Sequence, residues 1–247
     1  MCSSDLIAWG PSFAVLGWVY VVTFDRATGR GLLTAALTTL WGARLGWHIW
    51  RRHRRLGRED PRYTAIRLRH GPAFWWRSLL VVFWLQAVLA WVVSAPLLAA
   101  SRSECALFTY TDVLGVTAFV AGFVFEAVGD AQLERFRREP GSRERVLDTG
   151  VWRYTRHPNY FGDALLWWGL LVLGAGASRQ WAAAIGPALL TWLLVRVSGV
   201  ALVEHTLTAA KPGYRDYVAR TSAFIPWVPR RKRRARDSEQ RSEEHTS

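Results

Sequence analysis

The chain has 247 residues, of which 51% are hydrophobic, and it carries 15 Trp residues and a net charge of +13. Several apolar runs approach the length of about 20 residues that matches the hydrocarbon core of a bilayer, and this pattern excludes an ordinary soluble domain. The basic charge alone would admit nucleic acid as a partner, but the positions of the charges, described below, argue against that class.

Six membrane-spanning helices are expected along the chain, in an all-α integral membrane fold. Helices satisfy every backbone polar group within lipid, and the alternation of about ten residues that is typical of barrel strands is absent from the sequence. The expected helices are Ala8–Phe24, Gly31–Trp50, Phe74–Ala99, Asp112–Asp130, Phe161–Ala177 and Trp181–Glu204. The very short connection at residues 178–180 predicts a tight hairpin of the last two helices.

Basic residues gather in three segments. Arg51–Ala73, Ala131–Tyr160 and His205–Gln240 contain 8, 7 and 9 Lys and Arg residues, which is 24 of the 32. Six helices place all three segments on one side of the membrane, as the positive-inside rule requires. We therefore expect the basic loops and the C-terminus to be cytoplasmic, and the lipid bilayer rather than nucleic acid to be the partner.

Both ends resemble translated sequencing-adapter sequence. MCSSDL at residues 1–6 and RSEEHTS at residues 241–247 correspond to complementary parts of one common adapter, and we expect both to be scars outside the fold. The expected membrane domain covers residues 7–230, and residues 231–240 form a polybasic disordered tail attracted to anionic lipid. Outside the scars Cys105 is the one thiol, so no internal disulfide is expected, and no metal-ligand spacing predicts a metal.

The stretch GVWRYTRHPNYFGDALLWWG at residues 150–169 places polar side chains directly before an apolar run. Polar groups at a membrane boundary are costly unless a ligand or partner satisfies them, so the stretch predicts a site for an anionic ligand. Guanidinium groups bind phosphate through paired hydrogen bonds, and an amide and a carboxylate four residues apart share a helix face. The candidate residues are Arg153, Tyr154, Arg156, His157, Asn159, Tyr160 and Asp163.

Two alternatives for this stretch stay open. The first is a basic interfacial anchor, since Arg, Tyr and Trp commonly gather at membrane surfaces. The second concerns Asp163 alone, whose carboxylate would be favourable near a helix N-terminus for electrostatic reasons.

Two further groups lie where the expected helices meet the cytoplasm. Glu126 and Asp130 are four residues apart in the fourth helix, where carboxylates are functional candidates or pair with Arg44 or Arg196. The remaining predicted cofactor-binding residues are Asp130, Gln132, Arg137, Glu204, Tyr217 and Arg220. For Tyr217 and its neighbour Tyr214 an interfacial aromatic anchor is the alternative.

Four motifs together resemble one known family. RYTRHPNYFG, VEHTLTAAKPGYRDYVARTSAFIPW, GREDPRY and FEAVGDAQLERF are similar to the membrane family of steroid 5α-reductase-like proteins, in particular its bacterial branch of uncharacterised (DUF1295-like) proteins with the steroid 5α-reductase C-terminal domain. The resemblance covers roughly residues 7–230. It implies a seventh helix upstream in intact members and a cofactor-binding core formed by the C-terminal four helices, at about residues 112–230.

The resemblance also implies roles for single residues. Asn159 and Asp163 match positions that contact the nicotinamide half of NADPH, Asp130 matches a carboxylate that helps hold the cofactor, and Tyr217 matches a Tyr near the adenosine-phosphate end. The Glu and Tyr with which steroid reductases polarise the substrate carbonyl have no convincing match here, so no catalytic residue is assigned.

The expected function is an NADPH-dependent reductase, in a bacterial cytoplasmic membrane, of a carbon–carbon double bond in a small apolar, lipid-like substrate. The alternative is an S-adenosylmethionine-dependent methyltransferase, because RHPNYFG before a helical hairpin and a late glutamate also resembles isoprenylcysteine carboxyl methyltransferases. A third class is a membrane or lipid-interaction protein without enzymatic activity. The density of cations around the site separates the first two, since NADPH carries three phosphates and S-adenosylmethionine is itself cationic.

Overall fold

The computed structural model describes residues 3–24, 28–56, 83–104, 109–176, 178–197, 204, 207–208, 210–211 and 213–230. Their secondary structure is helical apart from turns, loops and an isolated β-bridge, so the expected all-α class is confirmed. Contacts divide the chain into a first unit, Met1–Phe123 with Ala164–Trp192, and a second unit, Val124–Asp163 with Leu193–Ser247. The GREDPRY motif, the beginning of the third expected helix, Cys105 and residues 231–247 lie outside the described residues.

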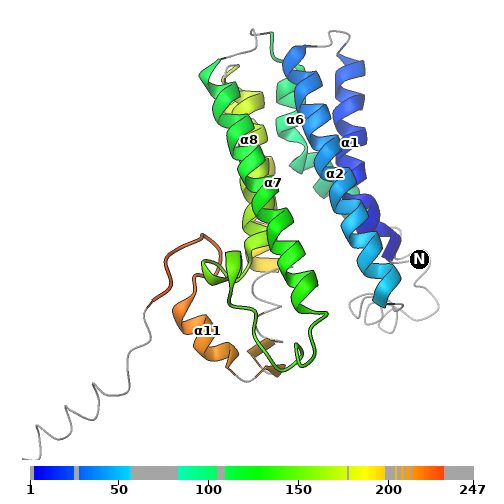
Figure 1. The fold of residues 1–247 in the computed structure, drawn as a ribbon. Coiled ribbons are helices and arrows are strands. Elements are labelled where there is room, and N and C mark those ends of the chain that lie inside the picture. The colour runs from blue at the N-terminus through cyan, green and yellow to red at the C-terminus, as the bar shows by residue number, and fades with distance from the viewer. Residues whose placement is uncertain are drawn as a thin grey trace, which may run out of the picture. The chain divides into compact units, whose positions relative to one another are not determined.

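The first unit begins with two long antiparallel helices, α1 at Ser3–Thr23 and α2 at Gly29–Leu56 (Figure 1). α1 starts earlier than expected, within the stretch that resembles an adapter scar. The two backbones approach closely because neither Gly10 nor Gly42 has a side chain: a Cβ on Gly42 would lie 2.4 Å from the carbonyl oxygen of Gly10. Close crossings of this kind depend on small residues in helices that pack inside membranes.

The third expected helix is broken within its described part. It consists of α5 at Leu85–Val93 and α6 at Ala95–Ser101, with Ser94 between them. Pro96 at the start of α6 has no backbone N–H, which ends the continuous ladder of α5. The Ser94 hydroxyl bonds to the carbonyl of Trp91, and it lies 2.8 Å from the Tyr20 hydroxyl of α1. These bonds satisfy polar groups at the break.

Two further long helices run antiparallel, α7 at Tyr110–Phe136 and α8 at Pro158–Ala175 (Figure 1). Within the first unit their crossing again depends on glycine, since a Cβ on Gly115 would lie 2.6 Å from the Leu173 nitrogen. The sixth expected helix is irregular: a 3-10 turn at Trp181–Ala184 leads into α9 at Ile185–Trp192, and a π-helical turn follows at Leu193–Val197.

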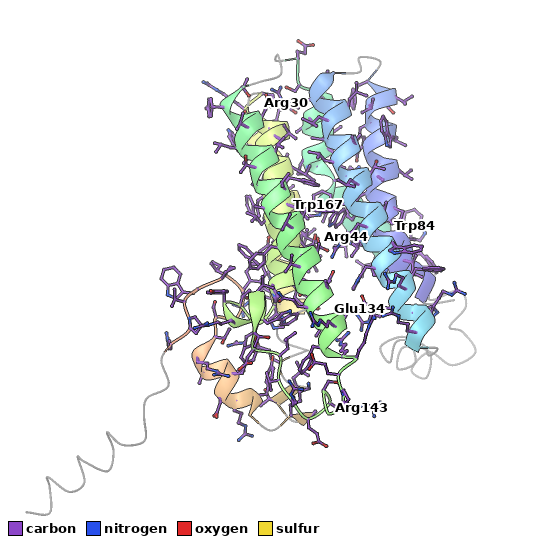
Figure 2. All side chains as sticks on the ribbon, viewed as in Figure 1. Arg30, Arg44, Trp84, Glu134, Arg143 and Trp167 are labelled. Atoms are coloured by element: carbon purple, nitrogen blue, oxygen red, sulfur yellow. The ribbon has the colours of Figure 1, made fainter. Side chains whose placement is uncertain are left out.

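An aromatic cluster forms the centre of the first unit. The rings of Phe13, Trp41 and Trp167, from α1, α2 and α8, lie 4.7 to 5.9 Å apart between centroids, and all three side chains are fully buried. Figure 2 shows Trp167 on the α8 ribbon of this unit. Large aromatic side chains supply most of the buried apolar area of such a core, so this cluster holds the three helices together.

A buried ion pair closes one end of the first unit, and the sequence did not predict it. Arg30, labelled at the start of α2 in Figure 2, donates from Nε to Asp112 Oδ1 (2.8 Å) and from Nη2 to Asp112 Oδ2 (2.9 Å). Its Nη1 donates to Ser103 Oγ, and Asp112 Oδ2 also accepts from the backbone N–H of Thr109. Arg30 has 1% of its surface exposed, so the charge is compensated within the protein.

The second unit is built from shorter pieces. The end of α7 and the beginning of α8 are joined by residues 137–157, which include a 3-10 turn at Gly150–Arg153. The short helix α11 at Tyr214–Arg220 follows later in the chain and leads into residues 221–230, which form bends, a β-bridge at Ser222 and a coil. Every residue that the sequence nominated for the cofactor site belongs to this unit.

Membrane-spanning character is clearest for one helix among the described residues. The helix at Tyr110–Arg137 is long and apolar enough to cross a bilayer, and Ile7–Thr23 and Trp181–Val197 are apolar but shorter. These three apolar helices agree with the general expectation of an apolar, helical protein. The number of spans, six, stays a prediction from the sequence.

Candidate functional site

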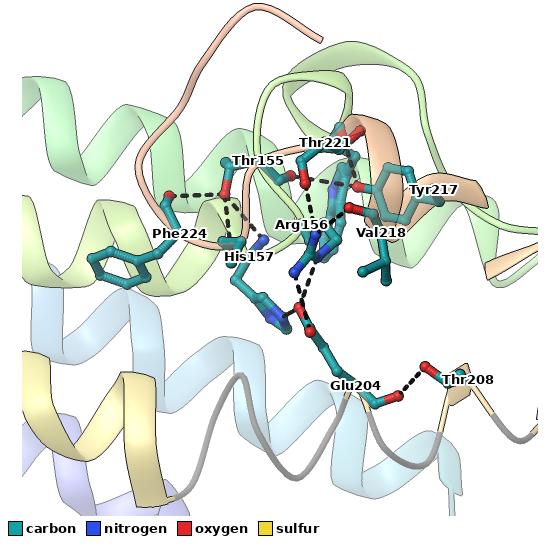
Figure 3. A network of polar contacts seen from close by, with 11 residues as sticks. Thr155, Arg156, His157, Glu204, Thr208, Tyr217, Val218, Thr221 and Phe224 are labelled. Carbon is teal, nitrogen blue, oxygen red and sulfur yellow. Dashed lines mark hydrogen bonds and ion pairs between the residues drawn. The ribbon is translucent and has the colours of Figure 1, made fainter. Parts of the chain in front are cut away.

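Arg156 is the centre of the polar network in the second unit (Figure 3). Its Nε and Nη2 donate to the two carboxylate oxygens of Glu204 at 2.7 and 3.1 Å, and its Nη1 donates to the carbonyls of Val218 (2.8 Å) and Thr221 (2.6 Å). The side chain is 8% exposed. A planar guanidinium is suited to such forked pairing with a carboxylate. Arg156 therefore joins the RYTRHPNY motif to two later segments of the chain.

Thr155 joins the same segments through the backbone. It forms a parallel β-bridge with Ser222, whose carbonyl accepts the N–H of Arg156 at 2.9 Å. The Thr155 hydroxyl donates to the Phe224 carbonyl at 2.8 Å and accepts the N–H of His157 at 3.3 Å. Thr155 is fully buried, so these bonds fix the motif against residues 222–224.

His157 is buried beside the same carboxylate. Its Nε2 lies 3.2 Å from Glu204 Oε1, and its ring stacks in parallel on that of Tyr160, with 5.4 Å between centroids. Burial lowers the pKa of His157 because it disfavours the charged ring, whereas Glu204 opposes this shift and Arg156 adds to it. The imidazole is therefore held in its neutral form near neutral pH.

The lowered pKa of His157 gives the second unit an acid-sensitive stability. The unfolded chain binds a proton at this ring more readily than the folded protein does, so stability should fall as the pH decreases below about 6.5. We expect a lower thermal midpoint at pH 5.5 than at pH 7.5, and a smaller difference between the two in His157→Gln. Equal pH dependence in the wild type and His157→Gln would contradict this assignment.

Tyr217 lies beneath the motif on α11. Its hydroxyl donates to the Trp152 carbonyl, and its ring meets that of Tyr214 edge to face at 5.8 Å. Burial is the main cause that raises both pKa values, that of Tyr214 to about 12. Both phenols therefore remain protonated at neutral pH, and Tyr217 supports the turn that presents Arg153.

The end of α7 contacts the motif from another side. A Cβ on Gly129 would lie 3.1 Å from the Pro158 ring, so α7 and α8 touch directly there. The Gly129 carbonyl accepts the indole N–H of Trp152 at 3.0 Å, and Gln132 Oε1 accepts the N–H of Val151 at 3.0 Å. These contacts bring the α7 residues around Gly129 to the turn before α8.

Gln132 has a second structural role at the turn. Gly150 has a φ of +61°, which favours glycine, and a Cβ at this position would lie 2.4 Å from the Gln132 amide. Because Gly150 has no side chain, the Gln132 amide can pack directly against its backbone.

The predicted site residues fall into two sets. One set is joined by the described contacts or lies directly beside them: Asp130, Gln132, Arg156, His157, Asn159, Tyr160, Glu204 and Tyr217. In the other set Arg153, Tyr154 and Arg137 are exposed, whereas Arg220 and Asp163 are half-buried and the Oδ1 atom of Asp163 is enclosed. Glu126 and Asp130 are both buried carboxylates on α7.

Arg220 stabilises the same unit from its α11 end. Its Nη2 is paired with Asp148 Oδ2, and its backbone carbonyl accepts the N–H of Arg230 at 2.9 Å. Neither partner was nominated from the sequence. Asp148 and Arg220 are 72 residues apart in the sequence. Local sequence spacing cannot predict a contact between residues so far apart along the chain.

Lys211 is another residue that sequence reasoning missed. Its ammonium donates to the carbonyls of Ser142 and Arg145, and it lies 5.4 Å from the Phe136 ring centroid. Burial lowers the Lys211 pKa, and Arg137 adds to the shift. Lys211 thus holds the loop after α7, and a lysine within a basic segment gives no sequence signal for such a role.

Similarity to known proteins covers most of the chain. An uncharacterised protein of the fission yeast Schizosaccharomyces pombe is 27% identical over 234 residues, which are 84% of this chain and 66% of that relative. The chain thus spans just under two thirds of the length of this fungal relative. No solved structure matches the chain. The profile of a family described as a protein of unknown function (DUF1295) matches residues 4–221, so the chain belongs to this family, which is steroid 5α-reductase-like as the motifs indicated.

Proposed function

We propose that the protein is a membrane-embedded, NAD(P)H-dependent reductase of a carbon–carbon double bond in a lipid-like or steroid-like substrate. The observation that carries this proposal is the concentration of the predicted cofactor residues in one unit, where the Arg156–Glu204 pair joins the RYTRHPNY motif to the late segments. A cofactor site assembled from distant segments requires such a connection. Membership of the steroid 5α-reductase-like family supports the same reaction class.

The residues present fit a nicotinamide cofactor in specific parts. Arg153, the first residue of the motif, is exposed and is suited to a phosphate, and Asn159 at the start of α8 offers an amide to a carboxamide or ribose hydroxyl. When bound, the cofactor would supply a hydride to the double bond. Arg156 acts differently: its donors already engage Glu204 and two carbonyls, so its role is to shape the motif.

S-adenosylmethionine is the second candidate, and one observation favours it. Glu204 neutralises Arg156, because its carboxylate is paired with the guanidinium at 2.7 Å. A site whose guanidinium is already compensated suits a cationic ligand better than a polyphosphate. On this alternative the chain is a methyltransferase of the isoprenylcysteine carboxyl methyltransferase type.

The membrane arrangement belongs to the same proposal. Six helices span the bacterial cytoplasmic membrane, and the three basic segments lie in the cytoplasm. The long apolar helix at Tyr110–Arg137 supports a membrane location. With this sidedness the second unit faces the cytoplasmic pool of nucleotide cofactors, and the apolar helices give a lipid-like substrate access from the bilayer.

Cofactor binding to detergent-purified protein tests the proposal directly. We expect NADPH to bind, and Asn159→Ala and Asp163→Ala to weaken this binding roughly tenfold or more, since each removes a hydrogen bond to the cofactor worth about 1.5 kcal/mol. Calorimetry with NADPH, NADH and S-adenosylmethionine measures the preference.

Glu144→Ala is the matched control, because Glu144 is exposed in the loop after α7. Binding of S-adenosylmethionine alone would replace the reductase by the methyltransferase. Binding of none of the three, with an intact fold by circular dichroism, would favour a protein without enzymatic activity.

A further inference from the structure

The segment Ser222–Arg230, here called the strap, is fixed along its whole length although it contains no helix. Its first half is bonded to Thr155 and Arg156 as described above. In its second half, the N–H of Trp227 donates to the Tyr154 carbonyl at 2.9 Å, and the N–H of Arg230 also donates to a backbone carbonyl. The strap therefore presents its side chains in defined directions.

The strap packs one apolar side chain inward and exposes several others. The ring of Phe224 packs edge to face against Phe161, with 5.9 Å between centroids. Ile225, Trp227 and Val228 point outward and are 65%, 72% and 74% exposed. Large apolar side chains that are exposed together, on a fixed backbone, mark a surface that meets a partner or a membrane.

The backbone of the strap is unsuited to pairing with another strand. Pro226 and Pro229 have no N–H to donate, and the N–H groups of Trp227 and Arg230 are already used within the unit. A peptide that added itself as a strand would need a regular row of free donors and acceptors. The chemistry of the outward side chains must therefore provide the recognition.

That chemistry is typical of a bilayer surface. Arg153 and Tyr154, both exposed, precede the bridge to the strap, and exposed Arg230 ends the strap, so cations flank the apolar side chains. Trp and Tyr prefer the boundary between headgroups and acyl chains, and Arg near that boundary binds anionic headgroups.

We propose that the strap docks on an anionic lipid surface, with Ile225, Trp227 and Val228 at the boundary between headgroups and acyl chains and Arg230 on the lipid phosphates. Because the strap is bonded to residues 154–156, docking braces the backbone of the RYTRHPNY motif. The proposal concerns a lipid contact, and it stands whether the unit binds NADPH, S-adenosylmethionine or neither.

The test uses an environment-sensitive fluorophore on a single cysteine. Val228→Cys is placed in the full chain with Cys2→Ser and Cys105→Ser, labelled with a nitrobenzoxadiazole dye, and reconstituted in nanodiscs of phosphatidylcholine with or without phosphatidylglycerol. The matched control is Glu144→Cys on the exposed loop of the same unit. We expect the label at 228 to emit at shorter wavelength and to be quenched by spin-labelled lipid, more strongly with phosphatidylglycerol, and the label at 144 to behave as in water.

Three outcomes would overturn the proposal. The first is equal, water-like emission from both labels in both bilayers. The second is a shift at position 228 that spin-labelled lipid does not quench but that grows with protein concentration, because this result identifies a second copy as the partner. The third is quenching that phosphatidylglycerol does not increase, since this result removes the anionic headgroup from the docking surface.

Discussion

Arg156→Ala is expected to destabilise the second unit by about 3–5 kcal/mol, the usual cost of removing one partner from a buried ion pair. The substitution leaves the Glu204 carboxylate without its forked partner and removes two bonds to the carbonyls of Val218 and Thr221. Hydrogen exchange at the Arg156 and Trp227 amides measures the effect locally, because both donate across the strap contacts. We expect their exchange to accelerate by more than about a hundredfold.

Two further variants separate a lost ion pair from a generally weakened unit. Arg138→Ala removes an exposed pair with Glu134 and should cost no more than about 0.5 kcal/mol. The double variant Arg156→Met with Glu204→Met should regain part of the loss, since no unpaired charge remains buried. If the amides at positions 156 and 227 exchanged at the same rate in Arg156→Ala and in Arg138→Ala, the Arg156–Glu204 pair would not support the unit.

The second large effect is expected in the first unit, where Asp112→Asn or Arg30→Ala should cost about 3–5 kcal/mol. Asp112 accepts two bonds from Arg30 and a third from the backbone of Thr109, where α7 begins. Losing the carboxylate leaves a guanidinium that is almost completely buried. Thermal unfolding in detergent, followed by tryptophan fluorescence, should show a lower midpoint for either variant.

Arg102→Ala is the control for this end of the first unit. Arg102 is exposed, and its guanidinium lies over the Phe24 ring at 5.6 Å from the centroid, a contact worth about 0.5–1 kcal/mol at the surface. A midpoint for Arg30→Ala equal to that of Arg102→Ala would show that burial of the ion pair contributes no stability.

The length of the apolar runs predicted where helices occur. It did not predict where each helix ends or whether it is regular. The long apolar runs are helical in the described residues, where each helix bonds its own backbone groups. The break at Ser94 was missed, although Pro96 could have indicated it. The π-helical turn at Leu193–Val197 has no sequence signal of its own, because it depends on how this part of the chain packs.

The polar network around Arg156 contains residues that the sequence nominated, but the bonds between them were not predicted. The RYTRHPNY motif marked Arg156 and His157, and a late glutamate marked Glu204. The sequence treated Arg156 as a ligand for phosphate, whereas the structure directs its donors to Glu204 and two carbonyls. A guanidinium binds either kind of anion, and only the folded chain determines which carboxylate lies within reach.

The Arg30–Asp112 pair could have been inferred from the predicted topology. Six helices place the start of the second and the start of the fourth on the same, weakly charged side of the membrane. A cation at the first of these helix starts and an anion at the second are natural partners. The count of basic residues placed Arg30 in the connection before the second helix, and its partner was therefore not sought.

The Arg156–Glu204 pair also sets the order of events during synthesis, because its members are 48 residues apart. At about 5–20 residues per second, about 2–10 s separate the emergence of the arginine from that of its carboxylate. The stretch between them includes α8 and α9, which are synthesised during this interval. The second unit therefore assembles as a late step of biogenesis, after most of the apolar helices have left the ribosome.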